Sequence, residues 1–200
     1  REELLALNPR DITTPEAYEK INAAREMLLS RGEIIIETVH VTKDGREIPV
    51  ESSVRLFNYL GRQAAISIAR DITEHKRAEE TLNLARADWE AIFQAIGQPT
   101  LILDPHFKIL EANRAALKVS GQDELKGKRC YEVFHNTDYA PESCPLIKIT
   151  SSGHLETTEM EIESVGGVFL VSCTTLFDDS GNLQKVIHVS TDITERKRSD

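Results

Sequence analysis

The chain has 200 residues, of which 40% are hydrophobic, 28% charged and 6% aromatic, and its formal net charge is −9. This composition excludes a collagenous, disordered or disulfide-rich chain and is typical of one large or two small globular domains. The acidic balance argues against nucleic acid as a partner, because phosphate binding needs clustered positive charge. No apolar run reaches the roughly 18 residues of a membrane span. With only three cysteines, we expect a reducing, cytoplasmic location.

The first expected element is a helix over 15–31. Pro15 lies in its first turn and Gly32 follows its end, as is usual for helix termini. Three strands are expected next, the last over 63–69, and the middle strand alternates apolar and polar residues at period 2. Such alternation is typical of an antiparallel sheet with one buried face. The apolar set of this sheet is Ile48, Val50, Val54, Leu56, Ile66 and Ile68.

An internal repeat organises the chain. Asp71-Ile72-Thr73-Glu74 recurs as Asp192-Ile193-Thr194-Glu195, an offset of 121 residues (192 − 71) that also places Gly45 on Gly166 and Val50 on Val171. Repeats of this kind mark duplicated structural units. We therefore expect two copies of one domain in tandem, the second with its last strand over 184–190.

A heptad pattern joins the two copies. Apolar and small residues recur at spacings of three and four over about three heptads, which favours a two-stranded coiled coil with a second copy of the chain. The alternative is an amphipathic helix packed on its own sheet. The stripe consists of His75, Ala78, Leu82, Ala85, Trp89, Ile92 and Ile96.

The second copy opens with a hairpin that the first copy lacks. Residues 100–113 indicate two short strands around Asp104-Pro105, and Asn113 is a good N-cap for a helix over 114–119. The first copy would then have three strands instead of five, with an exposed apolar face. The helix over 15–31, a second chain or residues outside this sequence could cover this face, and we expect the second chain to do so. The expected domains are a truncated copy (1–74), a connecting helix (75–97), a complete copy (98–194) and the start of an outgoing helix (195–200).

The repeated Asp-Ile-Thr-Glu motif stands where a strand becomes a helix. The aspartate can accept hydrogen bonds from the open first turn, and the glutamate three residues later completes a capping-box pattern. The motif either only starts a helix or also forms a stiff hinge that passes changes in the sheet to the helix. The candidate hinge residues are Asp71, Thr73, Glu74, Asp192, Thr194 and Glu195.

One group of residues in the second copy has side chains that can bind a transition metal. Cys130, His135 and Cys144 are of the types that bind zinc, iron or haem iron, although a structural zinc site needs four ligands and only His154 lies nearby as a fourth. Three interpretations stay open: a metal or haem site, a Cys130–Cys144 redox pair, and unreactive thiols.

The five-stranded antiparallel sheet with short flanking helices, ending in Asp-Ile-Thr-Glu and a Lys/Arg-rich helix start, resembles a PAS domain with its C-terminal PAC motif. The resemblance covers 89–198 and, in part, 2–77. It implies an α+β fold and a sensory, dimerising module of a signalling protein such as a sensor histidine kinase, with an output domain elsewhere in the parent protein. Some PAS domains are similar to this chain around Cys130 and Cys144 but have one more cysteine, which completes a metal site. This chain lacks that cysteine. PAS domains that form a flavin adduct have a sequence similar to Asn-Cys-Arg-Phe around the reactive cysteine. Here Cys130 follows Lys128-Arg129, so flavin photochemistry is not expected.

The inward positions of the second copy predict either a filled core or a pocket for a small apolar ligand. No bound cofactor is expected as the simplest outcome, and no kinase, cyclase or hydrolase motif occurs, so the segment is not expected to be an enzyme. The sequence leaves a sensory relay, a redox or metal sensor, and a ligand-free dimerisation spacer as hypotheses. The candidate pocket residues are Leu101, Leu103, Ile109, Leu117, Phe134, Ile147, Phe169, Val171, Cys173, Ile187 and Val189.

Overall fold

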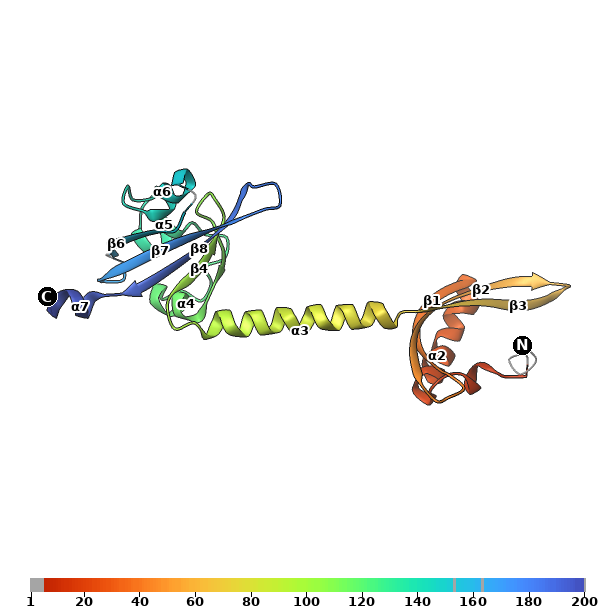
Figure 1. Ribbon diagram of the computed structural model, residues 1–200. Coiled ribbons are helices and arrows are strands. Elements are labelled where there is room, and N and C mark those ends of the chain that lie inside the picture. Colours follow the sequence, from red (N-terminus) through yellow and green to blue (C-terminus); the bar gives the residue numbers. More distant parts are fainter. Residues whose placement is uncertain (1–5, 153, 163, 200) are drawn as a thin grey trace. The chain divides into compact units, whose positions relative to one another are not determined.

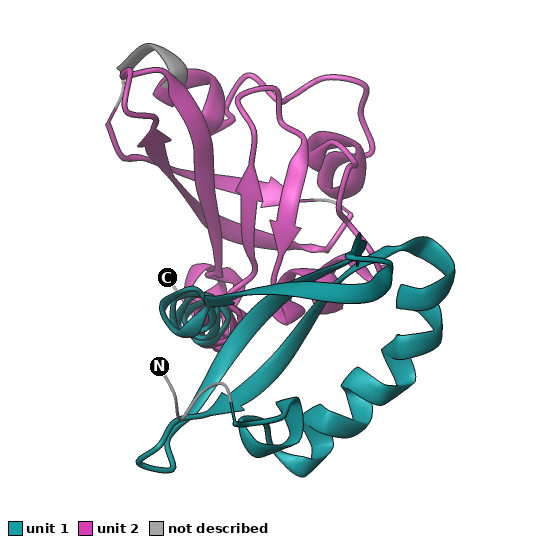
Figure 2. Cartoon of the chain, turned by 90° about the vertical axis from the view of Figure 1, so that its right-hand side faces the viewer, with its two compact units in different colours: residues 1–86 teal, residues 87–200 magenta. Residues whose placement is uncertain are grey.

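A computed structural model describes residues 6–152, 154–162 and 164–199, without the side chains of 150–152. The outermost residues of the expected first and last segments, 1–5 and 200, lie outside this range. The chain divides into two compact units (Figures 1 and 2), unit 1 over 1–86 and unit 2 over 87–200. The boundary falls inside the helix that the heptad pattern predicts.

Unit 1 is a helix packed on a three-stranded antiparallel sheet. After a short 3₁₀ turn, η1 (Pro9–Asp11), come α2 (Pro15–Arg31), β1 (Glu33–Val41), β2 (Glu47–Tyr59) and β3 (Arg62–Asp71), in the sheet order β1-β2-β3. The Thr14 hydroxyl accepts a hydrogen bond from the Ala17 amide at 3.2 Å, and Gly32 ends α2 in the left-handed conformation. These are the termini that the sequence predicts. Helix α2 packs on β1 and β2 (Figure 1), with Ala17 and Val50 buried.

The two faces of the unit 1 sheet differ from expectation in one respect. Ile68 lies opposite Ser53, which in turn lies opposite Ile35, so Ile66 and Ile68 occupy the face opposite to Val50 and not the same face. Their side chains are 52% and 66% exposed, and Ile35 is 68% exposed. The expectation that a partner chain covers the apolar face is wrong for the Val50 side of the sheet, because α2 of the same chain packs on it. The opposite face presents isoleucines to solvent.

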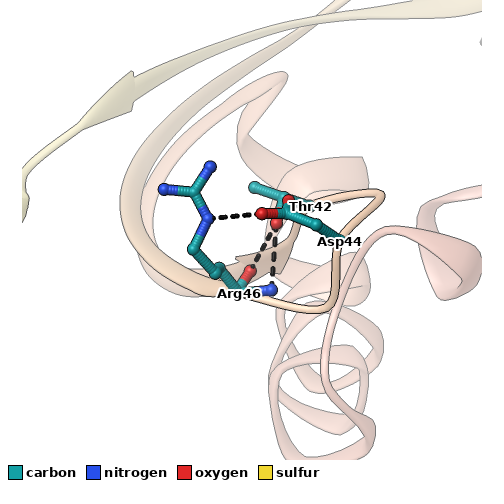
Figure 3. A network of polar contacts seen from close by, with 3 residues as sticks. All are labelled: Thr42, Asp44 and Arg46. Atoms are coloured by element: carbon teal, nitrogen blue, oxygen red, sulfur yellow. Dashed lines mark hydrogen bonds and ion pairs between the residues drawn. The ribbon is translucent and has the colours of Figure 1, made fainter.

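Polar networks and turn geometry close the hairpins. At the β1–β2 turn (Figure 3), the Thr42 hydroxyl accepts a hydrogen bond from the Arg46 amide at 3.0 Å, and Arg46 Nε donates to Asp44 at 2.7 Å. The side chains of Thr42 and Arg46 both hydrogen-bond the Asp44 carboxyl and lower its pKa. The β2–β3 turn consists of Leu60 and Gly61, both at positive φ, as in the type I′ turns that match strand twist.

Unit 2 contains the complete five-stranded sheet. Its elements are β4 (Thr100–Leu103), β5 (Ile109–Ala112), α4 (Arg114–Ser120), α5 (Cys130–His135), α6 (Pro145–Ser152), β6 (Glu156–Ile162), β7 (Gly167–Phe177), β8 (Leu183–Asp192) and α7 (Thr194–Ser199). The sheet order is β5-β4-β8-β7-β6, with all neighbours antiparallel. The predicted α+β fold, an antiparallel five-stranded sheet with flanking helices, is confirmed.

The last hairpins of the two units differ in register by two residues. Asp71 pairs with Val50, whereas Asp192 pairs with Phe169 and not with Val171, the residue that the 121-residue offset places there. The β7–β8 loop is longer than the two-residue turn of unit 1, and the register shifts at Leu176/Phe177. A register shift of two residues keeps every side chain on its own face of the sheet, so equivalent residues of the two units still face the same side.

Helix α3 (Thr73–Ala95) carries the heptad stripe. Residues 77–92 are all exposed, and Leu82, Trp89 and Ile92 are 70%, 48% and 67% exposed. Within the described part of the chain, then, most of the stripe is not packed on a sheet. Among these same residues, no helix is long and apolar enough to cross a membrane.

Candidate ligand pocket and its link to the outgoing helix

An apolar pocket lies within unit 2, between the sheet and the helical segment. Its free volume is about 30 Å³, which is room for about two or three water molecules. Four of the expected residues, Leu101, Phe134, Phe169 and Val171, line it. The other wall residues are Pro99, Val119, Cys130, Tyr131, His135, Ala140, Pro141, Cys144, Met160, Ile162, His188 and Ser190.

Several expected pocket residues belong to the surrounding core instead. Leu103, Ile109 and Cys173 are fully buried, and Leu117 is partly buried against the same cluster. They are not among the residues of the pocket wall. Their role is packing, since a fully enclosed aliphatic side chain fills the interior and does not face the free volume.

Three expected positions are wrong. Leu101 and Cys173 lie opposite His188, so Ile187 and Val189 point to the other face of β8 and cannot line the pocket. Ile187 and Val189 are as hydrophobic as core residues, so hydrophobicity alone assigns them to the interior, and a one-residue change of assignment exchanges the two faces of the strand. On α6, Ile147 is 41% exposed, whereas Leu146 and Ile149 are fully buried.

Sequence reasoning missed His188, the most polar group on the wall. The residue as a whole is half-buried, but its Nδ1 atom is enclosed and has no hydrogen-bond partner among the described residues. Burial lowers the pKa of His188 to about 4, and the nearby His135 adds to this. Burial also lowers the pKa of His135. Both imidazoles are therefore neutral at pH 7. The signal in the sequence was the alternation Val186-His188-Ser190, which pairs with the inward residues of β4 and β7.

The three cysteines are buried free thiols. Burial, with the neighbouring Cys144, raises the pKa of Cys130 to about 12. Burial likewise raises the pKa of Cys144 and of Cys173. Such thiols are poor nucleophiles, because the thiolate is the reactive form. Within residues 6–152, 154–162 and 164–199, no three His, Cys, Asp or Glu side chains are arranged to hold a metal ion.

The hinge motif forms the same local turn in both units. Asp71 Oδ1 accepts a hydrogen bond from the Thr73 amide, and Asp192 Oδ1 accepts one from the Thr194 amide, each at 2.8 Å. Hydrogen bonds from the following threonine lower the pKa of both carboxyls. Each bond spans two residues, as in an Asx turn, and not the three residues of the expected capping box. Glu74 and Glu195 are exposed in the first helical turns.

In unit 2 the motif is also bonded to β7. The Ile193 amide donates to the Val168 carbonyl at 2.9 Å, and the Val168 amide donates to the Thr194 hydroxyl at 3.0 Å. A Cβ on Gly167 would lie 2.6 Å from this hydroxyl and 3.2 Å from the Phe169 ring, so only glycine permits the close approach. Because Phe169 lines the pocket, one strand segment contacts both the pocket and the start of α7.

In unit 1 the motif is held to the sheet in a similar way. The Ile72 amide donates to the Pro49 carbonyl at 3.0 Å, and the Ile72 side chain is buried. Exposed ion pairs join the first turn of each helix to a strand of its own unit: Lys76 to Glu37 at 2.7 Å and Lys197 to Glu159 at 2.6 Å. Such surface pairs contribute little to stability, so the backbone hydrogen bonds are the main link between the motif and the sheet.

Comparison with known proteins assigns the family. A family model described as "PAS fold" matches residues 93–198, and one described as "PAS domain" matches residues 1–74. The first match alone covers more than half of the chain, so the chain belongs to the PAS family. Its five-stranded antiparallel sheet, short flanking helices and terminal Asp-Ile-Thr motif are those that the sequence resemblance implied.

Individual relatives are more distant. A methyl sulfide methyltransferase-associated sensor of Methanosarcina acetivorans is 33% identical over 92 residues, which are 46% of this chain and 9% of that protein. The chain therefore spans a small part of this curated relative. Among solved structures, the PAS domain of an HTR-like protein from Haloarcula marismortui is 18% identical with a TM-score of 0.46, covering 59% of this chain and 99% of that one. The PAS domain of nitrogen regulation protein NR(II) from Vibrio parahaemolyticus is 17% identical with a TM-score of 0.43, covering 52% and 96%.

Proposed function

We propose that the chain is a non-catalytic sensory relay made of two PAS modules in tandem, in which occupancy of the unit 2 pocket changes the start of α7. The observation that carries the proposal is the short path from Phe169 on the pocket wall to Val168, which bonds Ile193 and Thr194. A displacement of the Phe169 ring acts on a strand residue adjacent to the hinge. A relay of this kind needs two sites whose states are coupled.

The relay operates in a homodimer joined along α3. An exposed stripe of large apolar side chains is costly to leave in water, at roughly 1.5–3 kcal/mol for each large side chain. A second copy of the chain would bury this stripe, and the isoleucine face of unit 1 offers further apolar area to the same partner. We place the protein in the cytoplasm as part of a sensor histidine kinase, whose output domain would receive α7.

Substitution of Gly167 by Ala tests the relay. The added Cβ displaces Thr194, and we expect amide hydrogen exchange at Val168 and Ile193 to accelerate about fivefold, since loss of a hydrogen bond costs about 1 kcal/mol. The pocket must respond as well, and we expect the imidazole nitrogen resonances of His188 to shift. The control is Gly97→Ala, because a Cβ at Gly97 meets nothing within 4 Å.

The relay and the spacer give different results in this experiment. A Cβ on Gly167 also lies 3.2 Å from the Phe169 ring of the pocket wall, so the deciding variant is Thr194→Val, which removes only the hydroxyl that the Val168 amide bonds. In a relay, this change at the hinge also shifts the His188 resonances, because coupling is reciprocal. If the variant changes the exchange rate at Val168 but its His188 resonances match those of the Gly97→Ala control, the hinge and the pocket are uncoupled. A ligand-free dimerisation spacer is then the better description of the chain.

Redox or metal sensing through Cys130, His135 and Cys144 is the second candidate, because the cysteines are close enough to influence one another's ionisation. The raised thiol pKa values favour the relay. We expect the native chain to react with an aromatic disulfide reagent at pH 8 at least about a hundredfold more slowly than the unfolded chain. Rapid labelling of Cys130 or Cys144 in the native chain, or stoichiometric metal in the purified protein, would favour the redox or metal sensor.

A further inference from the structure

The polar groups of the unit 2 pocket are arranged in an unusual way for a filled core. His188 lies on the inward face of β8, opposite Leu101 and Cys173. Its Nδ1 atom is buried without a hydrogen-bond partner within the described residues. Buried polar groups are nearly always paired, and an unpaired one costs free energy unless a water or ligand completes it. Ser190, two residues along the same face, and His135 are further polar residues of the wall.

The other residues of the pocket wall determine which charge a bound molecule can carry. Among the residues that the structure describes, 6–152, 154–162 and 164–199, none that lines the pocket is Asp, Glu, Lys or Arg. The two histidines are neutral at pH 7, because burial lowers the pKa of each. A charged molecule would enter without a counter-charge, and burial of an unpaired charge is strongly unfavourable. The occupant is therefore uncharged.

The size and the hydrogen-bonding group follow from the same geometry. A free volume of about 30 Å³ limits the occupant of this state to a few heavy atoms. Neutral imidazole donates from one ring nitrogen and accepts at the other. A hydroxyl group both donates and accepts, so it pairs with Nδ1 in either tautomer. Aliphatic, aromatic and sulfur-containing side chains surround the rest of the volume and suit a short hydrocarbon.

We propose that the unit 2 pocket binds a small, uncharged molecule with one hydroxyl group, whose oxygen pairs with His188 Nδ1 while its hydrocarbon part contacts Phe169 and Met160. This inference rests on the proposed sensory function and names the ligand chemistry. Contact with Phe169 places the ligand against β7, the strand in which the Val168 amide bonds the Thr194 hydroxyl. His188 selects the hydroxyl, and the apolar wall selects against ions.

The test compares 1-propanol with 1-chloropropane, which has a similar chain but no hydroxyl. With the full 200-residue chain labelled at histidine nitrogens, we expect 1-propanol to shift the His188 Nδ1 resonance and 1-chloropropane to leave it nearly unchanged. We expect 1-propanol to bind about threefold to tenfold more tightly than 1-chloropropane, the range that one net hydrogen bond supplies. His188→Phe should abolish this preference, and His106→Phe, which alters an exposed histidine outside the pocket, should retain it.

Each alternative outcome overturns the proposal. Equal affinity for the two probes in the unaltered chain means that His188 makes no selective bond. Absence of binding by either probe means that a single water, or nothing, occupies the volume. Tighter binding of propionate than of 1-propanol means that the occupant is anionic. If His188→Phe fails to fold, the probe comparison and the Nδ1 shift in the unaltered chain still decide. The Gly167→Ala experiment uses no ligand, so failure of this proposal is distinguishable from failure of the relay.

Discussion

Two aspartates in the heptad stripe should convert the dimer that we propose to a monomer. In the variant Leu82→Asp with Ala85→Asp, each chain places two carboxylates in the seam that a second α3 would occupy. An unpaired charge buried in an interface costs several kcal/mol, and each lost leucine contact adds roughly 1.5–3 kcal/mol. Because about 1.4 kcal/mol corresponds to a factor of ten, we expect the dissociation constant to rise at least a thousandfold. Light scattering should then give the mass of one chain at micromolar concentration.

The matched control uses apolar exposure outside the stripe. Leu84 is 62% exposed, close to the 70% of Leu82, but it does not belong to the heptad set. Asn83→Asp with Leu84→Asp adds the same charge to α3 and should leave the dimer mass unchanged. A dimer that persists with Asp at positions 82 and 85 would remove α3 as the interface, and a unit 1 contact through Ile35 and Ile68 would take its place.

The second large effect is loss of stability in mild acid. The folded chain holds His188 neutral with a pKa of about 4, below the ordinary value of 6.5. Between these values the unfolded chain binds a proton that the folded chain does not, so stability is full above pH 6.5 and falls as the pH drops toward 4. The difference corresponds to about 3 kcal/mol. His135 on α5 faces the same space, and its lowered pKa acts in the same direction.

Urea unfolding at pH 7 and at pH 4.5 measures this loss. His188→Phe removes the titrating group and the unpaired Nδ1 atom, so the variant should lose about 2–3 kcal/mol less than the unaltered chain between the two pH values. Met160→Leu, a pocket substitution without a titrating group, should keep the full dependence. The carboxyls of Asp71 and Asp192 have lowered pKa values, so their contribution is lost only below their ordinary pKa of 3.8. An unchanged pH dependence in His188→Phe would mean that His188 is solvated.

Local patterns in the sequence determined much of this protein. The helix over 15–31 follows from Pro15 and Gly32, the hairpin and helix after residue 99 follow from Asp104-Pro105 and Asn113, and the antiparallel sheets follow from period-2 alternation. Each of these depends on neighbours within a few residues of one another, where chain geometry leaves few choices. The 121-residue repeat then related the two units through identical residues alone, and the Asp-Ile-Thr motif indicated the junction of strand and helix.

Only the tertiary structure decided which face of β8 meets the pocket. Ile187 and Val189 are as apolar as any core residue, and nothing in their own strand excludes them from the interior. The pairing of His188 with Leu101 and Cys173 places a histidine inside instead, because a strand in a sheet has no freedom to rotate independently of its partners. The bond between Val168 and Thr194 likewise joins residues 26 apart. Local composition determines the elements, whereas register and long-range contacts determine which side chains form the site.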